Sequence, residues 1–303
     1  MAATDPAVRV RSLSKGFDGG PRKGPDGGPV FDGVDLDAAR GEVTLLMGPN
    51  GAGKTILLSC IAGGLSPDSG DVEVFGRAPR EAREDLSFML QDGMLVDELT
   101  GRENVSFLEG LHPHSTDRWR DVLDDLDFDR DALDREVKDY SGGMARKLEL
   151  AVTLGVDAPL YLLDEPTAGL DLTTVDAVHS LLAERADAGD AVLLTSHIPV
   201  DAQLADRIVF VREHGVVADG VPEELLDAVP PVVHVGGVVD GVDEHVVDGR
   251  LFESGAERRG FLRDDADPDA VEGVADRPGA TVRVTEPTVT DLFNYYVHVA
   301  PGE

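Results

Sequence analysis

The chain has 303 residues, of which 42% are hydrophobic and 28% charged, enough to build one large or two modest folded domains with real cores. Acidic residues outnumber basic ones 59 to 27 and give a formal net charge of -32, so the surface repels phosphates and anionic lipids and disfavours a basic-groove nucleic-acid binder. Cys60 is the only cysteine, which excludes an internal disulfide, and we expect it to be buried as a small apolar side chain.

Short apolar runs alternate with longer helix-like segments along the first two thirds of the chain. The runs Val8–Leu13 and Val30–Leu36 are predicted strands, and between them GGPRKGPDGGP is expected to form an exposed flexible loop. This alternation is typical of a mostly parallel sheet covered by helices, so the predicted core is α/β. The later predicted strands are Val43–Met47, Leu160–Leu163, Ala191–Leu194 and Ile208–Val211.

Two further stretches depart from this pattern. In DRWRDVLDDLDFDRDALDREVKDY, apolar residues recur at helical spacing with acidic residues between them, which predicts a helical insert packed by Trp119. After about residue 222, short Val-rich segments are separated by Gly and Asp, and we expect a small second domain of mixed strands and helices.

The stretch GPNGAGKT, Gly48–Thr55, matches the pattern G-x-x-x-x-G-K-T between a predicted strand and a predicted helix. Such a loop turns successive backbone N–H groups and the positive end of the helix toward an anionic phosphate. Lys54 adds a mobile charge for the β- and γ-phosphates, and the Thr55 hydroxyl can ligate the accompanying magnesium ion. The loop therefore predicts phosphate binding.

The stretch LYLLDEPTAGLD ends a predicted strand in two adjacent carboxylates. Asp164 would face a metal ion and Glu165 could accept a proton from water, a pair that indicates hydrolysis. Carboxylates also begin ordinary turns, but that alternative does not explain Pro166, Gly169 and Asp171 at these spacings.

In YSGGMARKLEL, Ser141 precedes two glycines and a run with helical spacing, which predicts a capped helix N-terminus suited to an anion. Taken alone, an ordinary N-cap explains this stretch equally well.

With these three motifs in order, the chain resembles the nucleotide-binding subunit of an ABC transporter from about Val8 to Glu224. The likeness extends to Gln91 after a strand-like stretch, to the loop 168–171 and to His197 after LLTS. It implies a P-loop NTPase sheet with an antiparallel β subdomain and a helical subdomain at about residues 92–140. The implied domains are an ABC-type nucleotide-binding domain at 1–224 and a small accessory α+β domain at 225–303.

The resemblance also implies ATP and Mg²⁺ as cofactors and assigns roles to residues. Glu165 resembles the general base, His197 the contact to the γ-phosphate, and Gln91 the contact to magnesium and the attacking water. Phe17 resembles the aromatic residue that stacks on adenine. The implied metal ligands are Thr55, Gln91 and Asp164, and the implied nucleotide-binding residues are Phe17, Gly48, Pro49, Asn50, Gly51, Ala52, Gly53, Lys54, Thr55, Ser141, Gly142 and Gly143.

In such proteins two subunits pair head to tail, so Ser141–Gly143 of one would cap ATP held by Lys54 of the other. The implied partners are a second ATPase subunit, in a homodimer or pseudo-symmetric dimer, and separate integral membrane permease subunits, with no nucleic acid. Met144 in SGGM and the tail segment Pro287–Phe293 resemble drug-export ATPases, which implies export. A soluble, non-transport ABC-type ATPase acting as a conformational switch is the alternative.

Location and host follow from composition. No window approaches the roughly 20 apolar residues that a membrane-spanning helix needs, and MAATDPAVRV lacks the order of a secretion signal. We therefore expect a cytoplasmic protein, and the resemblance implies that it lies at the inner face of the membrane. The chain has five lysines against 39 aspartates, a balance that resembles haloarchaeal proteins and predicts a fold that depends on concentrated salt to screen its charge.

Overall fold

The structure is a computed structural model that describes residues 5–17, 29–212, 215–255, 257–275 and 279–300. Most of the Gly/Pro-rich insert predicted as a loop lies outside these residues. The chain divides into two compact units, residues 1–216 and 217–303. The division falls within the last strand of the large sheet. The domain boundary expected after residue 224 stays a prediction.

A six-stranded sheet forms the centre of the first unit, and the strand pairs that connect β5, β6, β7, β3 and β8 are parallel. All residues of β3, β6 and β7 are buried, which explains why their sequences are continuous apolar runs. The predicted α/β fold class is therefore confirmed. The strand order is β5 (Leu86–Met89), β6 (Leu160–Asp164), β7 (Ala191–Ser196), β3 (Val43–Met47), β8 (Arg207–Arg212) and β9 (Gly215–Gly220).

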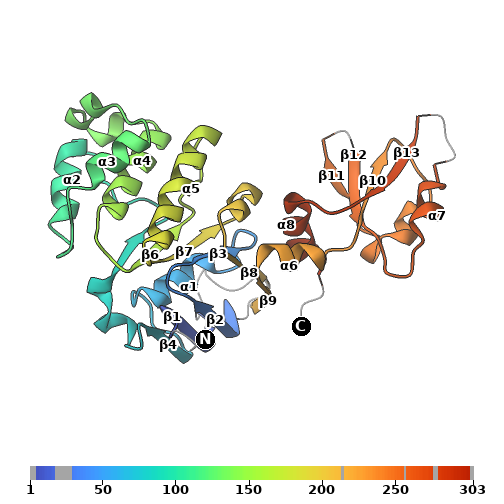
Figure 1. The fold of residues 1–303 in the computed structure, drawn as a ribbon, viewed down its shortest axis with the longest axis horizontal. Helices are drawn as coiled ribbons and strands as arrows, with labels where there is room; N and C mark the ends of the chain where they lie inside the picture. Colours follow the sequence, from blue (N-terminus) through green and yellow to red (C-terminus); the bar gives the residue numbers. More distant parts are fainter. Residues whose placement is uncertain (1–4, 18–28, 213–214, 256, 276–278, 301–303) are drawn as a thin grey trace. The chain divides into compact units, whose positions relative to one another are not determined.

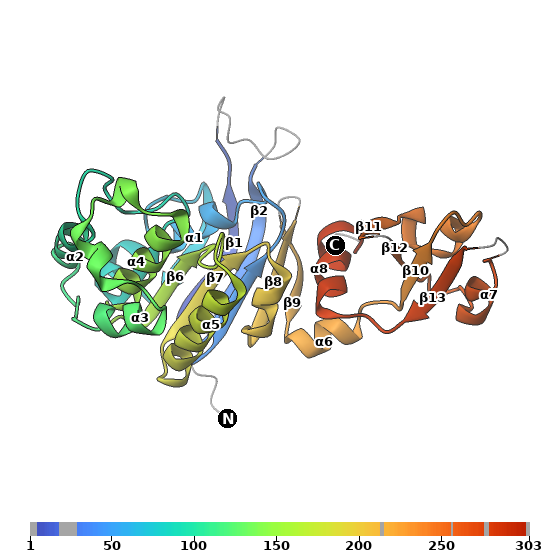
Figure 2. The same ribbon diagram turned by 90° about the horizontal axis from the view of Figure 1, so that it is seen from above.

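A smaller antiparallel sheet, in the order β2 (Phe31–Ala38), β1 (Val8–Lys15) and β4 (Ser69–Val74), belongs to the same unit. Between the two sheets lies α1 (Lys54–Ile61), whose apolar side chains share one core with both. Figure 2 shows α5 (Leu172–Asp187) on the opposite face of the large sheet. The helix that follows the phosphate loop is thus anchored by packing on two sides.

Helices gather at the β5 end of the large sheet (Figure 1). They are α2 (Gly101–Glu109), α3 (Trp119–Asp125) and α4 (Gly142–Leu154). Trp119 is buried and its indole N–H donates to a carboxylate oxygen of Glu109 at 2.9 Å, so the indole joins α3 to α2. The helical insert predicted around Trp119 is therefore present.

The second unit contains a four-stranded antiparallel sheet with short helices. One face packs Val233, Val235 and Val282 against Val271 to form a separate apolar core. The elements are α6 (Pro222–Asp227), β10 (Val232–Gly236), β11 (Phe252–Ser254), β12 (Glu257–Phe261), α7 (Pro268–Glu272), β13 (Thr281–Thr285) and α8 (Val289–His298), with strand order β11-β12-β10-β13.

Short 3-10 helices make many of the connections, and none of the described helices is long and apolar enough to span a bilayer. The 3-10 helices are η1 (Pro79–Glu81), η2 (Arg83–Asp85), η3 (Arg130–Asp134), η4 (Val137–Asp139), η5 (Pro199–Gln203), η6 (Val242–His245) and η7 (Val247–Gly249).

The burial of Cys60 on α1 leads to a test of this packing. The side chain is 1% exposed, and burial raises the pKa of its thiol to about 11 from 9.0. At pH ~8 the thiolate fraction then falls from about one in ten to about one in a thousand. We expect a maleimide to label the native chain far more slowly than the urea-unfolded chain, with free N-acetylcysteine as the control. Equal rates for native chain and free thiol would contradict this burial.

Candidate functional site

The predicted phosphate loop, Gly48–Thr55, joins the end of β3 to the start of α1. Gly51 and Gly53 have φ of 85° and 95°, a left-handed backbone that residues with a Cβ adopt only at a cost. A Cβ at Gly48 would lie 2.2 Å from the carbonyl oxygen of Val211, so that position also requires glycine. These glycines let the loop backbone fold tightly at the N-terminus of α1, where N–H groups suit an anion.

Lys54 is only 5% exposed, and its ammonium is held by the loop itself. Nζ donates to the carbonyl oxygens of Gly48 at 2.8 Å and Pro49 at 3.2 Å. Burial lowers the pKa of Lys54, while the nearby carboxylates of Glu165 and Asp164 oppose the shift. An anionic group bound beside Nζ would stabilise the charged ammonium, as expected for a phosphate ligand.

A cleft of about 610 Å³ lies beside the loop. Its volume is in the range of small-molecule sites. Part of its wall is apolar, formed by Val30, Ile56 and Leu65. The predicted site residues that line it are Asn50, Gly51, Gly53, Lys54, Thr55, Gln91 and Glu165.

Asp164 ends β6 and is completely buried. Its Oδ1 accepts a hydrogen bond from the Thr195 hydroxyl at 2.5 Å, whereas Oδ2 is buried with no hydrogen-bond partner in the described part of the chain. A buried carboxylate oxygen without a partner is costly unless a cation compensates it. The Asp164 side chain therefore fits a metal-binding role.

The chemical type of the predicted ligand atoms indicates which metal ion would fit. The Thr55 hydroxyl donates to Oε1 of Gln91 at 3.3 Å, so the candidate ligands are a hydroxyl, an amide oxygen and one carboxylate. Oxygen ligands with few carboxylates suit Mg²⁺, which retains waters and substrate phosphates in its shell. In the described ranges, no cluster of three or more His, Cys, Asp or Glu residues could hold a metal ion alone.

Glu165 follows with φ of 51°, a left-handed conformation that costs about 1–3 kcal/mol for a residue with a side chain. Its backbone is held at both ends: the N–H donates to the Thr195 hydroxyl at 2.9 Å, and the carbonyl accepts from Arg146 at 2.6 Å. Its carboxylate accepts from the amide of Gln91 at 3.2 Å and pairs with Nδ1 of His197 at 3.1 Å. The three predicted catalytic side chains therefore meet at one point.

Arg146 and Glu149 belong to this arrangement, and sequence reasoning missed both. Arg146 is buried on α4, where it donates to the backbone carbonyls of Asp164 and Glu165 and to Glu149. Glu149 in turn accepts from the backbone N–H of Met94 at 3.0 Å. An Arg and a Glu three residues apart on a helix have the spacing of an ordinary exposed ion pair. Only the tertiary fold shows that they hold the backbone around Glu165.

Ser141, Gly142 and Gly143 lie at the start of α4, where the Ser141 hydroxyl accepts from the N–H of Met144 at 3.2 Å. Ser141 and Gly142 are exposed, and a Cβ at either glycine would meet nothing within 4 Å. None of the three is among the residues that line the cleft. The chain therefore has two backbone turns suited to an anion, one beside the cleft and one outside it.

Four of the predicted nucleotide-binding residues that precede α1 do not line the cleft: Phe17, Gly48, Pro49 and Ala52. Of these, Phe17 and Ala52 pack into the apolar core. Phe17 is partly buried against the core, and Nζ of Lys15 lies 5.2 Å from its ring centroid. Its predicted contact with adenine stays a prediction.

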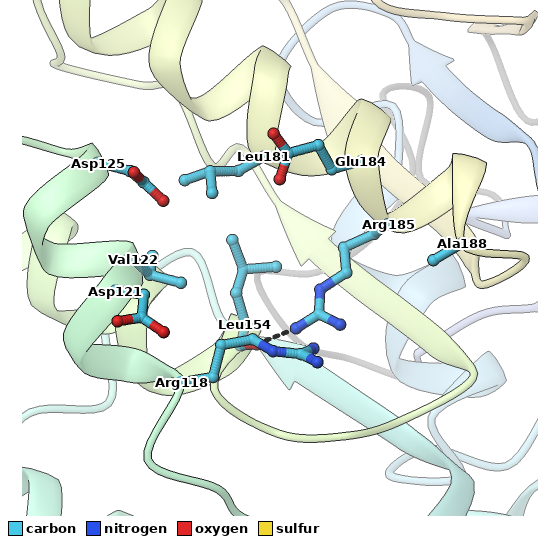
Figure 3. A pocket seen from close by; sticks show the side chains of 9 residues that line it. All are labelled: Arg118, Asp121, Val122, Asp125, Leu154, Leu181, Glu184, Arg185 and Ala188. Carbon is cyan, nitrogen blue, oxygen red and sulfur yellow. Dashed lines mark hydrogen bonds between the residues drawn. The ribbon is translucent and has the colours of Figure 1, made fainter.

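A second hollow of about 340 Å³ lies away from the phosphate loop. Figure 3 shows residues of α3 on one wall and residues of α5 on the other, with Arg185 donating to the carbonyl of Leu154. Its charged residues have both signs, and it contains none of the predicted site residues. The lining consists of Arg118, Asp121, Val122, Asp125, Leu154, Leu181, Glu184, Arg185 and Ala188.

Known proteins are similar to this chain in sequence. Residues 31–168 match the family described as ABC transporter. The daunorubicin/doxorubicin resistance ATP-binding protein DrrA of Streptomyces peucetius is 38% identical over 209 residues, which is 66% of this chain and 63% of that protein. The hemin import ATP-binding protein HmuV of Nocardia farcinica is 37% identical over 210 residues, which is 65% of this chain and 72% of that protein. The chain thus spans less than two thirds of the DrrA protein.

A solved structure agrees with the fold. A dimeric ATP-binding cassette in a post-hydrolysis state, bound to ADP and phosphate, superposes with a TM-score of 0.63 at 23% identity. The match covers 71% of this chain and 98% of that one.

Replacing Gly48 by alanine tests the close approach of the loop to β8. Because the added Cβ would overlap a backbone oxygen, we expect Gly48→Ala to lower the free energy of unfolding by about 1–3 kcal/mol and to weaken binding of a fluorescent ATP analogue. Gly64→Ala is the matched control, since its Cβ would meet only the Ser59 oxygen at 3.5 Å. Urea unfolding of both variants measures the difference, and equal stabilities would refute the predicted overlap.

Proposed function

Because the chain belongs to the ABC transporter family of ATP-binding proteins, we propose that it hydrolyses ATP to power transport through separate membrane-spanning subunits. One observation carries this proposal: the carboxylate of Glu165 is held between Gln91 and His197 beside the phosphate loop.

Each part of the cleft would contribute to ATP binding. The loop backbone and Lys54 would hold the phosphates. On binding, the Lys54 ammonium would donate to phosphate oxygens instead of to the carbonyl oxygens of Gly48 and Pro49, and their negative charge would favour its charged form. Phe17 would contact the adenine ring. Thr55, Gln91 and Asp164 would hold Mg²⁺, which supplies positive charge to the phosphate oxygens.

Hydrolysis would begin with a water molecule positioned by Gln91, while His197 would contact the γ-phosphate. Glu165 would accept a proton from this water, and its carboxylate is already oriented by two hydrogen-bonding side chains. The backbone bonds from Thr195 and Arg146 fix where this carboxylate lies. Such preorganisation lets the base act without a reorientation at the moment of reaction.

A second copy would complete the site. Ser141–Gly143 lie at the N-terminus of a 13-residue helix and outside the cleft of their own chain, and Ser141 and Gly142 are exposed, so this turn is available to cap a nucleotide held elsewhere. We therefore propose a head-to-tail dimer, as a homodimer or with a similar ATPase subunit. ATP would favour the closed dimer through the contacts that only this state makes.

Export through integral membrane permease subunits is the direction we propose, at the cytoplasmic face of the membrane. The resistance protein among the relatives and the tail segment Pro287–Phe293 support it, although the import protein is similarly close in sequence. Both relatives argue against the alternative of a soluble switch ATPase without transport. Net charge argues against a nucleic-acid partner.

We also propose that the host has a salt-rich cytoplasm, as in haloarchaea. The net charge of -32 and the scarcity of lysine support this, because a compact chain with so large a charge needs screening.

A Glu165→Gln variant tests catalysis and dimer formation together. We expect phosphate release at least about 100-fold slower than that of the wild type, because the amide cannot accept the proton. By light scattering in concentrated KCl, the variant should form a dimer only when ATP is present. Free phosphate, rather than a labelled acceptor, should receive the γ-phosphate.

Adding Gly142→Glu to this variant provides the control for the dimer. In one chain a Cβ added at Gly142 meets nothing within 4 Å, so the fold should be unchanged, whereas a nucleotide capped by this turn would be displaced. We expect ATP binding without a dimer. A monomeric Glu165→Gln variant that still binds ATP would refute the homodimer.

Salt dependence tests the proposed host. Raising KCl from about 0.1 M to about 1 M shortens the screening length from about 10 Å to about 3 Å, so we expect the melting temperature to rise by several degrees. Sucrose of equal osmolality is the control for crowding and viscosity. An unchanged melting temperature across the salt series would contradict the proposal.

A further inference from the structure

Asp201 is a completely buried carboxylate in η5 that has no role in the site as described so far. Oδ2 accepts from the hydroxyls of Thr167 at 2.7 Å and Ser196 at 2.5 Å, and Oδ1 pairs with Nε2 of His179 at 2.8 Å. Thr167 and Ser196 are themselves buried. One carboxylate thus gives partners to two buried hydroxyls, which would otherwise be buried at a cost, and to the partly buried imidazole of His179.

Two of these partners adjoin the catalytic side chains. Thr167 follows Glu165 by two residues, in the turn where the N–H of Ala168 donates to the Glu165 carbonyl at 3.1 Å. Ser196 is the residue before His197, and its hydroxyl also accepts from the N–H of Ile198 at 2.9 Å. Asp201 therefore connects the turn after Glu165 with the turn that carries His197.

The third partner connects the same carboxylate to α5. His179 lies two turns along this helix, whose first turn is capped by the side chain of Asp171. Asp201 therefore holds both ends of the turn between Glu165 and Asp171. It bonds Thr167 near the start of the turn and His179 on the helix that follows its end.

We propose that Asp201 is a positioning residue for the proposed ATP hydrolysis, and the inference rests on that function. By holding Thr167 and Ser196 on one oxygen, Asp201 keeps the Glu165 carboxylate at its 3.1 Å contact with His197. Asp201 is not among the residues that line the cleft. Its effect is on the position of the proposed base, Glu165, relative to His197, the side chain that would contact the γ-phosphate.

This role predicts a loss in kcat rather than in ATP binding. Lys54 and the phosphate loop make no hydrogen bond to the Asp201 group, so KM for ATP should change less than about threefold. Misplacing Glu165 or His197 by about 1 Å is sufficient to lower kcat by about 100-fold, which is the loss we expect for Asp201→Ala.

Conservative and partial variants separate positioning from folding. Asp201→Asn keeps the shape and one oxygen for the two hydroxyls, so it should retain kcat within about threefold of the wild type. Thr167→Val and Ser196→Ala each remove one hydroxyl and should lower kcat by about tenfold. These single-hydroxyl variants test the inference even if Asp201→Ala fails to fold.

A double-mutant cycle on kcat distinguishes a positioning role from a general loss of stability. In the Asp201→Ala background, adding Thr167→Val should lower kcat no further, because the connection is already absent. Asp206→Ala is the matched control: this carboxylate accepts the N–H of Val43 at the opposite end of β3, so its loss should reduce stability but leave kcat unchanged.

The outcomes distinguish this inference from the proposed function. If the wild type releases no phosphate from ATP, both are wrong. If the wild type hydrolyses ATP and Asp201→Ala keeps the wild-type kcat, only the positioning role is refuted. The same conclusion follows if Asp201→Ala and Asp206→Ala lower kcat by the same factor. An additive effect of Thr167→Val on Asp201→Ala would refute it as well.

Discussion

The left-handed backbone at Glu165 is the constraint on which the rest of the site depends. A residue with a side chain occupies this region at a cost of about 1–3 kcal/mol, so surrounding bonds must hold it there. Thr195 and Arg146 do so from the two sides of the residue. The chain therefore turns sharply after β6, and the carboxylate meets Gln91 and His197 at the mouth of the cleft. Thr195 and Arg146, which are not among the residues that line the cleft, thus determine where this carboxylate lies.

Parallel strands explain why these groups converge although they are far apart in sequence. The phosphate loop follows β3, Gln91 follows β5, Glu165 follows β6 and His197 follows β7. Because these strands run in one direction, their carboxyl ends share one edge of the sheet, which is where ligands bind in open α/β folds. Burial on both faces fixes the strands, and the loops at this edge remain free to carry chemistry.

Local patterns made part of this structure predictable. Continuous apolar runs identified β3, β6 and β7, and the glycines of the phosphate loop indicated a tight turn before a helix. Arg146 and Asp201 left no such signal, because their function depends on partners from other elements. The second unit was predicted only as mixed strands and helices, since short Val-rich segments carry no information on strand order.

The carboxylates of this acidic chain fall into many exposed groups and a few buried ones, and the buried ones make the contacts described above. The chain is strongly acidic, yet among the described residues of the first unit the buried carboxylates are Glu149, Asp164, Glu165 and Asp201. Three of them have both oxygens in hydrogen bonds or ion pairs, as burial of a charge requires. Of these four, Asp164 alone keeps an oxygen without a hydrogen-bond partner, which a bound cation would compensate. Salt screens exposed charges and hardly affects buried ones, so a change in ionic strength should act on the surface while this network persists.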